Sequence, residues 1–298
     1  MASTLSSTTG FATASTEPDI RLFYSVTPAL PLDPARPVIV LSNSLAANTE
    51  LWDAFTAEFA STHTIVRYDA RFHGRSPLST TPNFGYAAGH SIDDLADDVI
   101  VVLDTLGITS ANAPAFVGLS IGGGVGVSLA ARYPGRFSSF VIVGSRSHAA
   151  PGDEARMAER AAFYKTHGAR AQAEQSVERW FGKTWPTATP ENEKKAKQVA
   201  DIVEQTTLEG FVASAAALNR MDLREQAVTI GKRQSTEGNK NVLFVVGADD
   251  GALVVAESKQ LAAAASSPLE VVAECGHIVN VQQPARFHEI VRTWITKE

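Results

Sequence analysis

The stretch that decides the fold is residues 115–126, AFVGLSIGGGVG. Its first four residues predict a buried strand, and the segment from Gly122 to Tyr133 predicts a helix. Between them, Gly118-Leu119-Ser120-Ile121-Gly122 fits the pattern G-x-S-x-G in the strand–turn–helix setting that gives this pattern its meaning. Glycines on both sides of Ser120 permit a very tight turn, which pushes the hydroxyl out at the end of the strand. We therefore predict that Ser120 is a nucleophile facing the positive end of a helix.

Strands and helices alternate on both sides of this turn. Short apolar runs rich in β-branched residues predict strands at 37–41, 64–68, 115–118, 140–143, 242–246 and 269–272. Helical spacing of apolar residues predicts helices at 92–106, 122–133 and 285–295. This alternation is typical of βαβ units, so we expect an α/β fold with a mostly parallel sheet.

Residues 148–238 interrupt the alternation, because they contain helical patterns and no clear strand. We expect them to form a helical cap over the edge of the sheet where ligands bind in open α/β folds. The core is then made of residues 20–147 and 239–298. Residues 1–19 begin with an uncharged run of Ser, Thr and Ala that lacks the basic and apolar regions of a secretory signal. We expect a disordered leader there.

Composition excludes several classes of protein. The 26 Lys and Arg residues against 32 Asp and Glu give a net charge of −6, and the chain has no basic run, which argues against a nucleic-acid partner. The chain contains no run of 18 apolar residues, so the sequence predicts no membrane span. The single cysteine, Cys275, excludes an internal disulfide and a cysteine zinc site. We expect a cytoplasmic protein without metal or cofactor, and the oligomeric state stays open.

A serine nucleophile needs a base and an acid that orients the base. His277 directly follows the last predicted strand and is the preferred base, with His148 as its rival. Asp249 and Asp250 both follow the strand at 242–246; we prefer Asp250 and keep Asp249 open. The resulting order, Ser120, Asp250, His277, is the order expected when the serine lies on a strand-to-helix turn.

The oxyanion that forms during acyl transfer needs two backbone N–H donors. The residue after the nucleophile, Ile121, supplies one. The loop after the first core strand supplies the other, which we assign to Leu45, with the Ser44 side chain as a candidate helper.

With these residues in place, the chain resembles the α/β-hydrolase superfamily, and within it the 3-oxoadipate enol-lactonases. The resemblance covers residues 20–298. It rests on Asn43-Ser44-Leu45-Ala46 followed by Trp52-Asp53, on Asp69-Ala70-Arg71-Phe72-His73-Gly74-Arg75-Ser76, and on Arg179-Trp180-Phe181. It implies an α/β-hydrolase fold with helices on both faces of a mostly parallel sheet and an inserted helical cap. This chain departs from the enol-lactonase pattern at Ala46, at Phe72, and after the strand at 140–143.

The resemblance implies a two-step hydrolysis of a small lactone or ester through an acyl-enzyme. For a substrate that carries a carboxylate, Arg146 is the candidate cation, and Trp180 is a candidate pocket residue. Three other hydrolases on the same scaffold stay open as alternatives: a carboxylesterase, a carbon–carbon bond hydrolase and a hydrolase of larger lactones. A cofactor-free haloperoxidase is a further one, and a ligand-binding receptor with a hydrolase fold is the non-enzyme alternative.

Overall fold

The computed structural model describes residues 5–296 and contains one mixed sheet. Within these residues the sheet has eight strands in the order β1-β2-β4-β3-β5-β6-β7-β8. The strands are β1 (Thr8–Thr16), β2 (Asp19–Thr27), β3 (Val38–Ser42), β4 (Thr64–Tyr68), β5 (Ala115–Leu119), β6 (Ser139–Val143), β7 (Val242–Gly247) and β8 (Leu269–Val272). Strands β4, β3, β5, β6, β7 and β8 run parallel, whereas β1 and β2 pair antiparallel at one edge. The predicted α/β fold is confirmed, and each predicted strand begins and ends within one residue of an observed strand.

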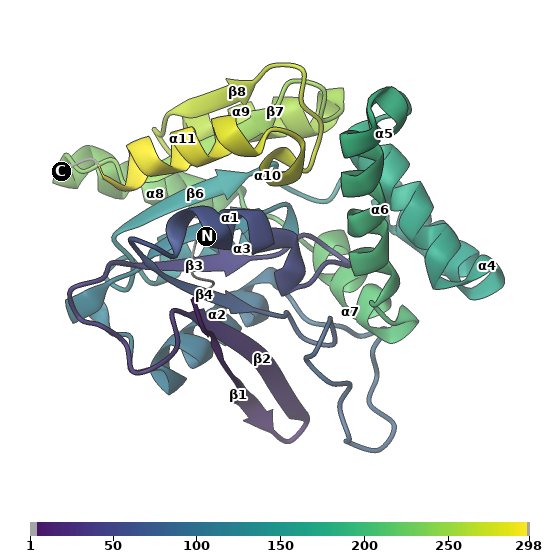
Figure 1. The fold of residues 1–298 in the computed structure, drawn as a ribbon, viewed down its shortest axis with the longest axis horizontal. Coiled ribbons are helices and arrows are strands. Elements are labelled where there is room, and N and C mark those ends of the chain that lie inside the picture. Colours follow the sequence, from purple (N-terminus) through teal and green to yellow (C-terminus); the bar gives the residue numbers. More distant parts are fainter. Residues whose placement is uncertain (1–4, 297–298) are drawn as a thin grey trace.

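Helices cover both faces of the sheet and one of its ends (Figure 1). They are α1 (Asp53–Phe59), α2 (Ile92–Thr105), α3 (Ile121–Arg132), α4 (Asp153–Phe181), α5 (Trp185–Ala188), α6 (Pro190–Glu204), α7 (Leu208–Asn219), α8 (Arg224–Glu237), α9 (Ala252–Ala264), α10 (Val279–Gln282) and α11 (Pro284–Ile295), with 3-10 turns η1 (Thr49–Trp52) and η2 (Ser110–Asn112). Helices α1 and α11 pack together on one face; α2, α3, α8 and α9 form a contiguous layer on the other.

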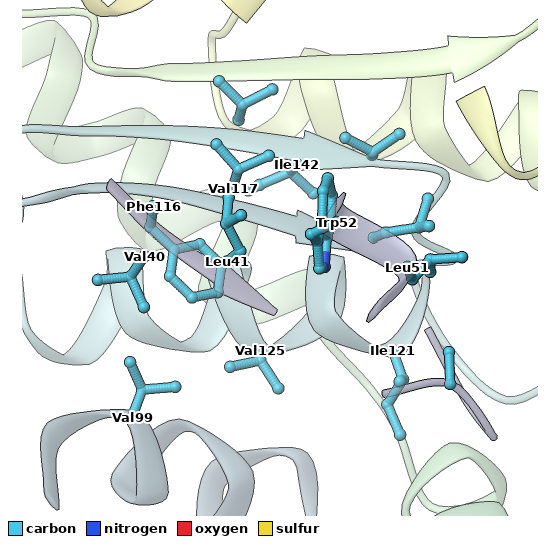
Figure 2. Close-up of a cluster of buried hydrophobic side chains, with 14 of the residues drawn as sticks. Val40, Leu41, Leu51, Trp52, Val99, Phe116, Val117, Ile121, Val125 and Ile142 are labelled. Carbon is cyan, nitrogen blue, oxygen red and sulfur yellow. The ribbon is translucent and has the colours of Figure 1, made fainter. Parts of the chain in front are cut away.

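The centre of the sheet is buried on both faces. Every residue of β3 and β5 is buried, which explains their continuous apolar sequences. Figure 2 shows Val40 of β3 and Phe116 of β5 in one cluster with Val99 of α2 and Val125 of α3. Burying a side chain such as Phe116 contributes about 2 kcal/mol. This packing gives the loops at the strand ends a rigid base.

The prediction of a disordered leader over residues 1–19 is wrong for residues 8–16, which form β1. This strand pairs antiparallel with β2 from Thr8 opposite Val26 to Thr16 opposite Asp19. The sequence does not predict this strand, because an edge strand needs few apolar residues. Ala12 is buried, whereas Phe11 is exposed and packs its ring edge against Phe23. Residues 1–4 of the predicted leader lie outside the described residues.

The cap consists of α4, α5, α6 and α7, which lie together beyond the carboxyl ends of the parallel strands (Figure 1). Helix α8 packs instead against α3 and α9 of the core. A Cβ on Gly231 of α8 would lie only 2.3 Å from the Ala264 carbonyl oxygen of α9, so the two helices approach closely. The predicted cap boundary at residue 238 is therefore too late, and the cap ends before Arg224. None of the helices within residues 5–296 is long and apolar enough to cross a membrane.

Candidate active site

Ser120 lies at the turn between β5 and α3 with φ 60° and ψ −114°. A positive φ is strained for a residue with a side chain. The Ser120 N–H donates to the Val143 carbonyl at 2.7 Å, which ties the turn to β6. A Cβ on Gly118 would lie 2.1 Å from the Gly122 carbonyl oxygen, and one on Gly122 would lie 2.7 Å from the Ser42 carbonyl oxygen. The two glycines flanking the serine are therefore required by close backbone approach.

Asp250 and His277 come from the loops after β7 and β8 and meet directly. The His277 Nδ1 atom lies 2.8 Å from Oδ2 and 2.9 Å from Oδ1 of Asp250. Asp250 is buried. Its neighbour Asp249 is exposed, and the Asp249 backbone N–H donates to the Cys275 carbonyl. Of the two candidates, Asp250 is thus the carboxylate in contact with the imidazole.

The cap holds the histidine loop in place. The His277 backbone N–H donates to the Trp180 carbonyl at 2.8 Å, and the two rings have centroids 6.3 Å apart. Cys275, two residues earlier, is fully buried, and burial raises the pKa of its thiol to about 12, assisted by the nearby Asp250 charge. At neutral pH this thiol is therefore protonated and unreactive.

The rival base, His148, lies in a different environment. Its Nδ1 atom lies 2.8 Å from the Ser147 hydroxyl and 3.8 Å from the Glu257 carboxylate. Within residues 5–296, it is not among the side chains that line the cavity at Ser120. His148 therefore belongs to a polar cluster at the start of the cap.

One cavity of about 280 Å³ joins these groups between core and cap. Its lining residues are Ser44, Leu45, Ser120, Gly144, Arg146, Asp153, Arg156, Met157, Arg160, Arg179, Trp180, Leu218, Asn219, Met221, Asp250, Val254 and His277. Leu45 lines this cavity and Ile121 is not among its lining residues within residues 5–296, but both line a much smaller neighbouring cavity. The Ser44 hydroxyl is buried and has no hydrogen-bond partner among the described residues. Ser120, His277, Asp250 and the loop that contains Ser44 and Leu45 therefore surround a single space.

Comparison with known proteins shows the family to which this fold belongs. The alpha/beta hydrolase fold family matches residues 37–284, which is most of the chain. The chain belongs to the alpha/beta hydrolase fold family. As a member, it is an enzyme of the kind that hydrolyses ester or lactone bonds.

Two relatives and one solved structure are similar along most of this hydrolase. It is 32% identical over 257 residues, 86% of this chain and 87% of the relative, to 3-oxoadipate enol-lactonase 2 of Acinetobacter baylyi. It is 26% identical over 255 residues, 85% and 89% of the two chains, to the putative carbamate hydrolase RutD of Caulobacter segnis. The crystal structure of the enol-lactonase from Burkholderia xenovorans superposes with a TM-score of 0.78 at 27% identity, covering 97% of this chain and 100% of that one. The expected resemblance is therefore confirmed.

Arg146 lines the cavity of this hydrolase, but it is not the free cation that the sequence suggested. Its guanidinium lies 2.8 Å from Asp153 and 3.1 Å from Glu257. Burial opposes its charge, yet the hydrogen bonds to Glu257 and Asp153 outweigh burial and raise the pKa of Arg146. Glu257 lies 111 residues away in α9, so no local pattern revealed the pairing. The charge of Arg146 is already compensated by two carboxylates.

Three other arginines of the cavity were not singled out as cations from sequence: Arg156, Arg160 and Arg179, all on α4. Arg156 pairs with Asp153. Arg179 stood in the Arg-Trp-Phe segment of the resemblance, whereas nothing in the sequence marked Arg160. Among residues 5–296, no group of three or more His, Cys, Asp or Glu side chains is arranged to hold a metal ion.

Proposed function

We propose that this hydrolase opens a small lactone or ester through an acyl-enzyme on Ser120, with His277 as base and Asp250 as the acid that orients it. The observation that carries the proposal is the contact between His277 and the buried Asp250 at the wall of the cavity that Ser120 also lines. A base held by a carboxylate, beside a strained serine turn, is the arrangement that activates a hydroxyl.

The first step forms the acyl-enzyme. His277 Nε2 accepts the Ser120 proton while Oγ bonds to the substrate carbonyl carbon, and the carbonyl electron pair moves onto its oxygen. The N–H groups of Leu45 and Ile121 stabilise that oxyanion, each by about 3 kcal/mol. The carbonyl re-forms as the ester oxygen leaves and takes the proton back from His277. Asp250 stabilises the imidazolium between these transfers.

The second step is hydrolysis. Water gives a proton to His277 and bonds to the acyl carbon, and Ser120 leaves with that proton, which restores the enzyme. In a lactone the leaving oxygen remains tethered to the acyl group. In an enol lactone it departs easily, because the leaving enolate takes up the proton returned by His277 and becomes a stable ketone. Similarity to two proteins named enol-lactonases supports this substrate type.

The cavity measures about 280 Å³, close to the lower end of the range of roughly 300–1,000 Å³ for ligand pockets, so it has room for a small lactone or ester. A carbamate hydrolase is the second candidate, supported by the similarity to the putative carbamate hydrolase. A carboxylesterase and a carbon–carbon bond hydrolase would use the same three residues. A receptor would leave Ser120 unreactive.

A panel of four compounds tests the proposal: a small enol lactone, a saturated γ-lactone, a nitrophenyl acetate and a small carbamate. We expect the enol lactone to give the highest kcat/KM and Ser120→Ala to abolish turnover of every compound. Highest activity on the carbamate would favour the second candidate. Hydrolysis that survives in Ser120→Ala would contradict the mechanism.

A further inference from the structure

The small cavity beside the substrate cavity measures about 10 Å³, which is room for about one water molecule. Among the described residues, those with polar side chains on its wall are Ser42, Asn43, Ser44, Tyr68, His73 and Ser214. Each of these is more than nine-tenths buried. Ser44 and Leu45 line both cavities. The small cavity therefore adjoins the loop that carries the proposed oxyanion donor, the Leu45 N–H.

Two side chains on this wall carry buried oxygens that the described chain leaves without a hydrogen bond. The Asn43 Nδ2 group donates to the Tyr68 carbonyl at 2.9 Å, which orients the amide. The Asn43 Oδ1 atom has no hydrogen-bond partner among residues 5–296, and neither has the Ser44 hydroxyl. A buried polar atom without a hydrogen bond is costly to the folded state. Both oxygens therefore call for a partner inside the cavity.

A pair of hydroxyls on the same wall supplies a donor. The hydroxyl oxygens of Ser42 and Tyr68 lie 2.7 Å apart. Burial raises the pKa of Tyr68 well above its ordinary value, so both hydroxyls keep their hydrogens at neutral pH. One hydrogen is shared between the two oxygens, which leaves the other to donate elsewhere. Two acceptors and one donor match an internal water, which typically makes about three hydrogen bonds.

The loop between β3 and η1 gains a fixed point from such a water. Ala46 has a positive φ of 62°, which is strained for a residue with a side chain. Asn43 ties one end of the loop to β4, and the Thr206 hydroxyl of the cap donates to the Ala46 carbonyl at 3.0 Å at the other end. Ser44 and Leu45 lie between these ties. Because such strain persists only where the surroundings hold the backbone, a hydrogen bond to Ser44 would fix the segment that carries the Leu45 N–H.

We propose that one internal water molecule occupies this cavity and positions the oxyanion loop. The water donates hydrogen bonds to Asn43 Oδ1 and Ser44 Oγ and accepts one from the hydroxyl pair. It holds the Leu45 N–H where the oxyanion forms, which makes Asn43 a positioning residue. Ser44 serves the water as an acceptor, so its own hydrogen remains available to the oxyanion in the substrate cavity. The catalytic part of this inference rests on the proposed acyl-enzyme function, whereas the water site itself does not.

A high-resolution crystal structure of the wild-type protein tests the water site. We expect one density peak at about 2.5–3.0 Å from both Asn43 Oδ1 and Ser44 Oγ. An empty cavity overturns the water site, and so does a peak with the contacts of about 2.4 Å that a metal ion makes to oxygen. This result does not depend on which substrate the enzyme opens.

Asn43→Leu tests the positioning role, because leucine is similar in size and has no polar side-chain atom. We expect kcat to fall about tenfold to a hundredfold, with KM within about twofold of wild type, because only transition-state stabilisation is lost. Gln234→Leu is the matched control. Gln234 is buried in α8 and donates to the Ala265 carbonyl at 2.6 Å, and within residues 5–296 it lines neither cavity. This control should lose stability and keep the wild-type kcat.

Val125→Ile tests the same role without changing a polar partner of the water, since Val125 lines the small cavity and the added methyl group fills it. Val127→Ile is its control: Val127 is buried in the same helix and, among the described residues, is not on the wall of either cavity. We expect kcat to fall in Val125→Ile and to stay unchanged in Val127→Ile. An unchanged kcat in Asn43→Leu, or in a Val125→Ile variant whose crystal structure has lost the water, overturns the positioning role.

The two measurements separate this inference from the proposed function. A wild-type protein that holds the water but opens no lactone or ester overturns the proposed function and supports the water site. Lactone hydrolysis by a wild-type protein whose small cavity is empty does the reverse.

Discussion

The Nδ1 atom of His277 lies within 2.9 Å of both carboxylate oxygens of Asp250. The two residues are 27 positions apart and come from the loops after β8 and β7. Because Asp250 occupies Nδ1, Nε2 is the imidazole nitrogen left for the cavity that Ser120 also lines. Asp250→Asn should lower kcat by about 10⁴, because an amide favours the wrong tautomer of the base. Steady-state kinetics measures the loss. Asp249→Asn is the control, since Asp249 is exposed, and its kcat should stay within about twofold of wild type. A larger loss in Asp249→Asn than in Asp250→Asn would reverse the assignment.

The turn that presents Ser120 depends on Gly118. An alanine there would place a Cβ 2.1 Å from the Gly122 carbonyl oxygen. Because that atom belongs to the backbone, Gly118→Ala should lower the free energy of unfolding by about 3 kcal/mol or more. Chemical denaturation measures the change. Gly135→Ala is the control, because no atom of residues 5–296 outside its immediate neighbours lies within 4 Å of a Cβ at that position. This variant should leave the free energy of unfolding unchanged or slightly raised. Equal stability of the two variants would contradict the close approach.

The buried Ser44 hydroxyl has no hydrogen-bond partner among residues 5–296. If this hydroxyl donates a hydrogen bond to the oxyanion, Ser44→Ala should lower kcat about tenfold. The free energy of unfolding should stay within about 1 kcal/mol of wild type. Ser258→Ala should do the opposite, because Ser258 is buried in α9 and donates to the Ser145 carbonyl. Its loss should reduce stability by about 1 kcal/mol and leave kcat unchanged. An unchanged kcat in Ser44→Ala would remove Ser44 from the mechanism.

Glu257 connects the core helix α9 to the start of the cap. Burial disfavours its charge, but hydrogen bonds from Arg146 and from the Ser147 N–H outweigh burial and hold the pKa of Glu257 below its ordinary value of 4.5. A lowered pKa in the folded state stabilises the protein above pH 4.5, and this contribution disappears as the pH falls through the folded-state pKa. Glu257→Gln should therefore cost about 2 kcal/mol at pH 7, and the difference from wild type should vanish in acid.

Denaturation curves across this pH range measure the effect of Glu257→Gln. Glu178→Gln, which removes an exposed partner of Lys183, should change stability by less than about 0.5 kcal/mol at every pH. A Glu257→Gln penalty that persists unchanged in acid would show that the ionised carboxylate is not what stabilises the cap junction.

The central part of the fold could be predicted because its signals are local. A continuous apolar run predicts a buried strand such as β5. The turn at Ser120 is predicted by its glycines, which are required because backbone atoms only a few residues apart come into close contact. The order of Ser120, Asp250 and His277 along the chain followed from where the strands end. The same logic failed for β1, since a strand held at an edge by backbone pairing has no need of an apolar pattern.

The cationic wall of the cavity could not be predicted, because it depends on contacts between distant segments. Arg146, in the loop after β6, is paired with Glu257 of α9, which lies 111 positions away in the sequence. Arg160 and Arg179 stand 19 positions apart and reach one cavity only through the kink at Gly168. The predicted end of the cap is wrong for a similar reason: α8 is polar in composition like α4 and α6, and its packing against α3 and α9 assigns it to the core.

Labelling with a fluorophosphonate, followed by intact-mass and peptide analysis, shows directly whether Ser120 is an activated nucleophile, because this probe phosphonylates an activated serine hydroxyl. We expect one adduct on the wild-type protein, located at Ser120, no adduct on folded Ser120→Ala, and labelling slowed by orders of magnitude in His277→Ala. An adduct at another residue, or a folded wild-type protein that takes up no label, would contradict a Ser120 acyl-enzyme.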